Sequence, residues 1–157
     1  MEMNKVRTPC IGICSTTSLG DLICRGCKRY SYEVINWNSY GDEEKLAVLS
    51  RIEQLNNQII AARFTIHSSA LLQAALKQFK VPYDPSRSPY CWLHNLLKKA
   101  HDQLEDVSRY GFLVREDFRH IALVELSEQV ENELLVLCEA HYNRYIFNDR
   151  INLPGNG

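Results

Sequence analysis

Residues 10–27 read CIGICSTTSLGDLICRGC and hold four of the six cysteines of the 157-residue chain. Cys10, Cys14, Cys24 and Cys27 follow the spacing C-x3-C-x9-C-x2-C. A tetrahedral metal ion takes four thiolates at metal–sulfur distances of about 2.3 Å, and two close pairs joined by a short loop supply them at a small entropic cost. The spacing therefore predicts a metal site formed by these four thiolates.

Two states without a metal compete with this interpretation: unligated thiols, and two disulfides formed on oxidation. The N-terminal residues MEMNKVRTPC lack the apolar stretch of a secretion signal, and no apolar run approaches the roughly 20 residues that cross a bilayer. We therefore expect a cytoplasmic protein without membrane contact, a setting that disfavours disulfides.

The choice of metal stays open on spacing alone, because zinc and iron–sulfur clusters both accept four thiolates. The N-terminal segment is small and has little core of its own, so it needs a closed structural site to stabilise it. One Zn²⁺ ion is the cofactor that we expect. An iron–sulfur cluster at the same four cysteines is the alternative.

A wider pattern surrounds the cysteines: P-C-x3-C, a short loop, C-x-G-C-x-R, then E-[IV]-x-x-W and an acidic helix start. Its marks in this chain are Pro9, Cys10, Cys14, Cys24, Gly26, Cys27, Arg29, Glu33, Trp37 and the run Asp42-Glu43-Glu44. On these residues, the segment from Thr8 to Ile52 resembles the small bacterial family called domain of unknown function 1289, labelled as predicted iron–sulfur proteins. The resemblance implies metal binding by the four cysteines and does not extend beyond residue 52.

Basic and aromatic side chains around the second cysteine pair are candidates for contact with a partner or a nucleic acid. They are Arg25, Lys28, Arg29, Tyr30, Tyr32 and Trp37. Such a mixture can stack on bases and hold phosphates. However, 18 basic against 19 acidic residues give a net charge of -1, so no overall field gathers nucleic acid. We expect a macromolecular partner, a protein ahead of a nucleic acid.

The sequence divides into three parts. Residues 1–41 hold four of the seven glycines as well as the four cysteines, and we interpret them as a metal-binding head. Residues 42–151 form a helical body, and residues 152–157 a flexible tail. Five basic residues against three acidic ones make the head mildly basic, and the body is mildly acidic.

Apolar residues of the body recur every three or four positions, the period of amphipathic helices. We expect a short helix at about residues 32–37, a long helix from 42 with a break near 65–69, a helix from 89 to about 110, and a last helix from about 115 to 147. Ser88-Pro89 suits a helix start, and Gly111 suits a left-handed C-cap. No strand-like alternation of useful length occurs. The sequence thus predicts an all-α fold, the four-cysteine knuckle followed by an antiparallel bundle of three to four helices.

Two further Cys-x2-His pairs, Cys91 with His94 and Cys138 with His141, suggest a second metal site. Helical phase argues against it, because Cys91 and His94 point away from the apolar face of their helix. A buried thiol and a core histidine are the preferred interpretation. Motifs of nucleophilic, phosphate-binding or metalloprotease catalysis are absent from the sequence, so we expect no catalysis of its own.

Overall fold

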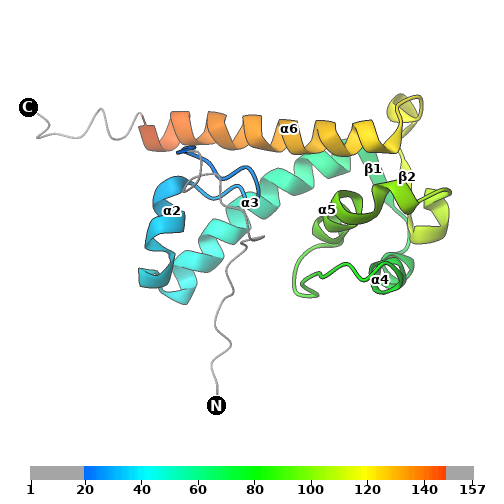
Figure 1. The fold of residues 1–157 in the computed structure, drawn as a ribbon, viewed down its shortest axis with the longest axis horizontal. Coiled ribbons are helices and arrows are strands. Elements are labelled where there is room, and N and C mark those ends of the chain that lie inside the picture. The colour runs from blue at the N-terminus through cyan, green and yellow to red at the C-terminus, as the bar shows by residue number, and fades with distance from the viewer. Residues whose placement is uncertain (1–19, 148–157) are drawn as a thin grey trace, which may run out of the picture. The chain divides into compact units, whose positions relative to one another are not determined.

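The computed structural model describes residues 20–147, so Cys10 and Cys14 lie outside the described residues. The described chain is mainly helical (Figure 1). Its α-helices are α2 (Ser31–Asn36), α3 (Asp42–Arg63), α4 (Ser69–Gln78), α5 (Pro89–Ala100) and α6 (Leu123–His141). Short 3-10 helices lie at Trp37–Ser39, His101–Gln103, Val107–Tyr110 and Glu116–Phe118, and a π-helical turn, Tyr142–Phe147, follows α6.

The predicted all-α class is wrong in one respect, because the chain forms a small antiparallel sheet. Strand β1 (Phe64–Ile66) pairs with β2 (Phe112–Val114), with Phe64 opposite Val114. Phe64 and Phe112 are fully buried and meet edge to face, with ring centroids 5.8 Å apart. Strands of three residues are too short to show an alternating pattern, so the pairing is invisible in the sequence.

The sheet explains the expected break after α3. The helix ends at Arg63, β1 follows directly, and α4 starts at a new N-cap, where Ser68 accepts a hydrogen bond from the Leu71 amide at 3.2 Å. The helix start at Ser88-Pro89 is confirmed, since Ser88 is the N-cap of α5.

Two helix limits differ from the expectation. Helix α5 ends at Ala100 instead of continuing to about residue 110, and α6 begins at Leu123 instead of about 115. Gly111 does adopt the left-handed conformation, with φ of 90°, but it caps the 3-10 helix before β2. A Cβ atom at Gly111 would lie 2.8 Å from the Leu72 amide and closer still to the Ser68 carbonyl, so only glycine fits there.

The chain forms two compact units. The cysteine unit comprises the described residues 20–52 and 134–147, and the central unit comprises residues 53–133. The boundary falls within α3 and α6, so each of these helices contributes to both units. The predicted head at residues 1–41 and the predicted bundle stay predictions.

Leucines from α4, α5 and α6 build the core of the central unit. Leu72, Leu76, Leu93, Leu97 and Leu126 are fully buried. Leu93 and Leu97 thus form part of the buried face of α5. At the start of α3, Leu46 is 45% exposed while Val48 is buried.

Candidate metal centre

Cys24 and Cys27 lie at the tip of a small hairpin. Ile23 and Tyr30 form an antiparallel bridge, and the Ser31 amide donates to the Leu22 carbonyl at 2.7 Å. Inside this bridge the Cys24 amide donates to the Arg29 carbonyl at 2.9 Å. The two cysteines are therefore fixed close together by backbone hydrogen bonds.

The turn itself is tight and uses a left-handed residue. The Lys28 amide donates to the Cys24 carbonyl at 2.8 Å, and Lys28 has a φ of 67°. A left-handed residue other than glycine costs about 1–2 kcal/mol, so the surrounding contacts must hold it. The Lys28 side chain is 2% exposed and folds back on the turn, where its Nζ donates to the carbonyls of Arg25 and Gly26.

Both sulfurs are shielded from solvent, since Cys24 is 2% and Cys27 9% exposed. The Arg29 Nε donates to the Cys27 Sγ at 3.2 Å. Burial raises the pKa of the Cys27 thiol above its ordinary value, and the Arg29 hydrogen bond opposes this effect. The second cysteine pair is thus a buried sulfur donor set with a cation against one sulfur.

Trp37 packs against the side of the hairpin that carries Arg29. The Arg29 guanidinium carbon lies 4.7 Å from the centroid of the Trp37 ring, and the Lys45 Nζ lies 5.8 Å from it. Trp37 is 5% exposed. Because the ring packs on Arg29, it fixes the plane of the guanidinium.

Glu33 joins the hairpin to α2 and α3. Its Oε1 accepts the Tyr30 amide at 2.8 Å, and its two carboxylate oxygens accept the Arg51 Nη1 and Nη2, each at 2.7 Å. The Arg51 guanidinium also lies over the Tyr30 ring, 3.9 Å from its centroid. Burial lowers the pKa of Arg51, but the hydrogen bonds and charge of Glu33 outweigh it and raise that pKa overall.

The end of α6 completes the cysteine unit. Cys138 is fully buried, and Tyr142 meets Tyr30 edge to face, with ring centroids 5.1 Å apart. Burial raises the pKa of the Cys138 thiol to about 11. Sequence reasoning missed Arg51 and Tyr142 as neighbours of the hairpin, because no local pattern marks contacts over such chain separations.

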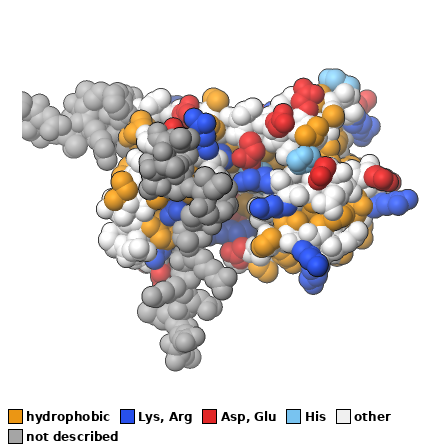
Figure 2. All heavy atoms as spheres, viewed as in Figure 1, with side chains coloured by type: hydrophobic (Ala, Val, Ile, Leu, Met, Phe, Trp, Pro, Cys, Tyr) orange, Lys and Arg blue, Asp and Glu red, His pale blue; other side chains and the backbone are white. Residues whose placement is uncertain are grey.

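The residues predicted for partner contact divide by burial. Lys28, Arg29, Tyr30 and Trp37 are buried, so they support the hairpin. Tyr32 is half-buried, and the Arg25 side chain is 65% exposed and lies 3.0 Å from the Asp21 carboxylate. Arg25 is therefore the most solvent-exposed of the six. Figure 2 shows Lys and Arg side chains mixed with acidic and apolar ones on the face in view.

The residues of the second Cys-x2-His hypothesis have other contacts. The Cys91 Sγ lies 3.7 Å from the Asn57 Oδ1 and 3.8 Å from the Ser88 Oγ, and His94 Nε2 contacts a Glu131 carboxylate oxygen. Residues 20–147 hold no cluster of three or more Cys, His, Asp or Glu arranged to bind a metal. Cys10 and Cys14 of the predicted four-cysteine set lie outside these residues.

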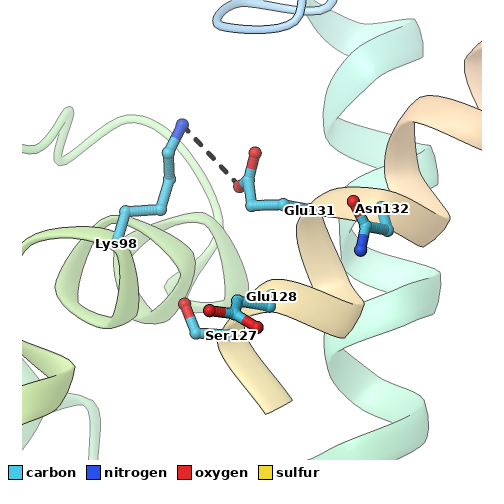
Figure 3. Close-up of a pocket in the computed structure, with 5 residues that line it drawn as sticks. All are labelled: Lys98, Ser127, Glu128, Glu131 and Asn132. Atoms are coloured by element: carbon cyan, nitrogen blue, oxygen red, sulfur yellow. Dashed lines mark ion pairs between the residues drawn. The ribbon is translucent and has the colours of Figure 1, made fainter. Parts of the chain in front are cut away.

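A cavity of about 410 Å³ in the central unit lies between α5 and α6. Lys98 points toward Glu131 across it, with Nζ 3.7 Å from Oε1 (Figure 3). Ser127, Glu128 and Asn132 complete its lining. The Ser127 hydroxyl donates to the Leu97 carbonyl at 3.4 Å, so this cavity presents no activated nucleophile.

The hairpin offers two of the thiols that a four-thiolate metal site needs. Cys24 and Cys27 are not joined in a disulfide, and both are buried in one tight turn. A cationic hydrogen-bond donor against Cys27 suits a sulfur that carries negative charge. Cys24 and Cys27 would therefore hold the metal from this side.

No helix within residues 20–147 has both the length and the apolar content needed to cross a membrane. No solved structure matches the chain.

Known sequences match the N-terminal part of the chain. It is 43% identical over 54 residues to Uncharacterized protein YdhL of Escherichia coli (strain K12), and equally to Uncharacterized protein YdhL of Shigella flexneri. These matches cover 34% of this chain and 66% of each relative, slightly under two thirds of the relatives' length. The resemblance predicted from the sequence is confirmed, because residues 8–56 match the family model described as Protein of unknown function (DUF1289).

Proposed function

We propose that this chain is a cytoplasmic metal-binding interaction protein without catalysis of its own. Cys10, Cys14, Cys24 and Cys27 hold one Zn²⁺ ion, which orders the N-terminal head as a four-cysteine knuckle. The head and the helical body then dock on a macromolecular partner, a protein in preference to a nucleic acid.

The observation that carries this proposal is the hairpin that presents Cys24 and Cys27. Two buried sulfurs lie in a turn closed by main-chain hydrogen bonds, with the Arg29 cation on one of them. The turn is short and has little core of its own, so metal binding would supply folding free energy that local packing does not.

A protein partner is supported by apolar side chains at the surface of the cysteine unit. Ile35 is 74% exposed, Leu22 58% and Val136 59%. Covering exposed aliphatic side chains with a protein lowers the free energy of the complex. Nucleic acids, in contrast, are bound by cationic side chains and by aromatic rings that stack on bases. The aromatic rings of Tyr30 and Trp37 are already covered by Arg51 and Arg29.

An iron–sulfur cluster at the same four cysteines, for electron transfer or for sensing oxidants or iron, is the alternative function. Its support is the chemistry of the donors, since buried thiolates with a cationic donor suit a cluster as well as zinc.

Metal analysis of the full chain purified without oxygen separates the two. One equivalent of zinc in a colourless protein supports the first function, and a brown protein whose visible absorption disappears on oxidation supports the second. A chain that holds neither metal overturns both.

Matched cysteine variants test the ligand set. Cys24→Ser should lose the metal and unfold the head while most of the helical circular dichroism signal remains. Cys91→Ser, which alters a thiol of the central unit, should keep the metal. Loss of metal in both variants, or loss of helicity throughout Cys24→Ser, would contradict the proposal.

The partner class has its own test. Binding to RNA or DNA at low salt that Arg25→Glu abolishes would transfer the preference to a nucleic acid. We expect that Arg25→Glu leaves the complex with the protein partner unchanged. We expect that Ile35→Lys weakens the same complex.

A further inference from the structure

We propose that Arg29 is the positioning residue of the metal centre, so that it sets metal affinity through Cys27 beyond its part in folding. This inference rests on the proposed four-cysteine site. It adds a specific role for one buried cation.

The Arg29 side chain is unusual because it is buried and donates a hydrogen bond to a cysteine sulfur. It is 3% exposed, and a guanidinium so enclosed requires a negative charge or strong acceptors. Among residues 20–147 no carboxylate forms an ion pair with it, and its Nε donates to the Cys27 Sγ at 3.2 Å. The charge that matches Arg29 is therefore expected on the sulfur.

Arg51 of the same unit provides the comparison. Its guanidinium donates to both carboxylate oxygens of Glu33, each at 2.7 Å. The unit thus supplies a carboxylate to one enclosed guanidinium and a cysteine to the other. A neutral thiol would leave Arg29 without an anion, whereas a metal-bound thiolate satisfies it.

Arg29 reaches both described cysteines. Its carbonyl accepts the Cys24 amide at 2.9 Å, and its side chain contacts Cys27. Trp37 packs on the guanidinium, with 4.7 Å from the guanidinium carbon to the ring centroid, and holds the Nε toward the sulfur. One residue thereby fixes the spacing and the orientation of the pair.

Three variants of the full chain separate charge from geometry. Arg29→Gln removes the cation, Arg29→Lys keeps the charge but loses the planar donor, and Arg25→Gln alters a neighbouring arginine whose side chain is 65% exposed. Changes to residues that orient ligands cost about 10- to 100-fold in metal affinity. We expect that loss for Arg29→Gln, a smaller one for Arg29→Lys, and less than a twofold change for Arg25→Gln.

Zn²⁺ affinity is measured by competition with a chelator, and urea unfolding is followed with and without Zn²⁺. Substituting Co²⁺ adds a spectroscopic readout, because loss of a hydrogen bond to Cys27 moves the sulfur-to-cobalt charge-transfer band to longer wavelength. Circular dichroism checks that each variant folds. If Arg29→Gln does not fold, Arg29→Lys takes its place in the test.

The outcomes are distinct. A wild-type chain that binds no metal overturns the proposed function and this inference together. This inference alone is overturned if the wild-type chain binds Zn²⁺ and Arg29→Gln binds it with an affinity within twofold of the wild type and an unshifted cobalt charge-transfer band. If Arg29→Gln does not fold, the same result in Arg29→Lys overturns it. Equal losses in Arg29→Gln and Arg25→Gln also overturn it, because a general charge effect would then explain both.

Discussion

Glu33→Gln tests the hydrogen-bonded ion pair that connects the hairpin to α3. Glu33 is 4% exposed in its side chain and accepts two hydrogen bonds from Arg51 and one from the Tyr30 amide. The amide of glutamine has one acceptor oxygen and no charge, so Arg51 would remain enclosed without its anion. Arg51 has an 18% exposed side chain, which keeps the effect below that of a fully buried cation.

Breaking a buried ion pair costs about 3–5 kcal/mol, and the residual exposure of Arg51 places this case near 3 kcal/mol. That is a change of about 150-fold in the unfolding equilibrium. A unit of roughly 50 residues is stable by only about 2.5–7.5 kcal/mol, so Glu33→Gln removes a large part of the stability of the cysteine unit.

The two tryptophans of the chain allow each unit to be followed alone. Trp37 lies in the cysteine unit and Trp92 in the central unit, and they are 5% and 6% exposed. Urea unfolding is measured by fluorescence in Trp92→Phe and Trp37→Phe backgrounds. Glu33→Gln should lower the midpoint reported by Trp37 strongly and that reported by Trp92 much less.

The matched control is Glu43→Gln on the exposed first turn of α3, which should change stability by less than about 0.5 kcal/mol. A loss below about 0.5 kcal/mol in Glu33→Gln itself would show that this ion pair does not stabilise the cysteine unit. The double variant Glu33→Leu/Arg51→Met should recover part of the loss, because it removes the uncompensated charge.

Three more predictions concern pH, thiol reactivity and a buried hydroxyl. Burial alone would raise the pKa of Glu53, but hydrogen bonds from Arg87 and Ser88 outweigh it and hold that pKa below 4.5. The resulting stabilisation is present above pH 4.5 and lost as the pH falls through the lowered pKa, so Glu53→Gln should flatten the acid dependence of the Trp92 unfolding midpoint. Burial raises the pKa of Cys91 from 9.0 to about 11, so iodoacetamide should alkylate Cys91 at pH 7 about 100-fold more slowly in the folded chain than in urea. Mass spectrometry measures both rates, and folded and unfolded rates within about threefold of each other would contradict this. The Tyr30 hydroxyl is buried without a hydrogen-bond partner in the described part of the chain, so Tyr30→Phe should leave the Trp37 midpoint unchanged or raise it, and a loss above about 1 kcal/mol would show a missing partner.

The resemblance marks Arg29, Glu33 and Trp37 at steps of four residues, and the structure gives each a physical role. Arg29 contacts Cys27, Trp37 packs on Arg29, and Glu33 accepts the Tyr30 amide. All three contacts join residues close in sequence, which is why a local pattern could indicate them. The role of Glu33 toward Arg51 could not be predicted, because the partner lies on another helix.

The local features of this protein follow from its sequence. Ser88-Pro89 started a helix and Gly111 supplied the left-handed cap, because each depends on the covalent geometry of neighbouring residues. The metal-binding role of the four cysteines, which their spacing predicts, stays a prediction. Which distant segments meet depends on the tertiary packing. Strands β1 and β2 pair where Phe64 and Phe112 are buried, and Tyr142 packs on the buried Tyr30. Because apolar burial is non-directional, no local pattern specifies which partner a buried side chain meets.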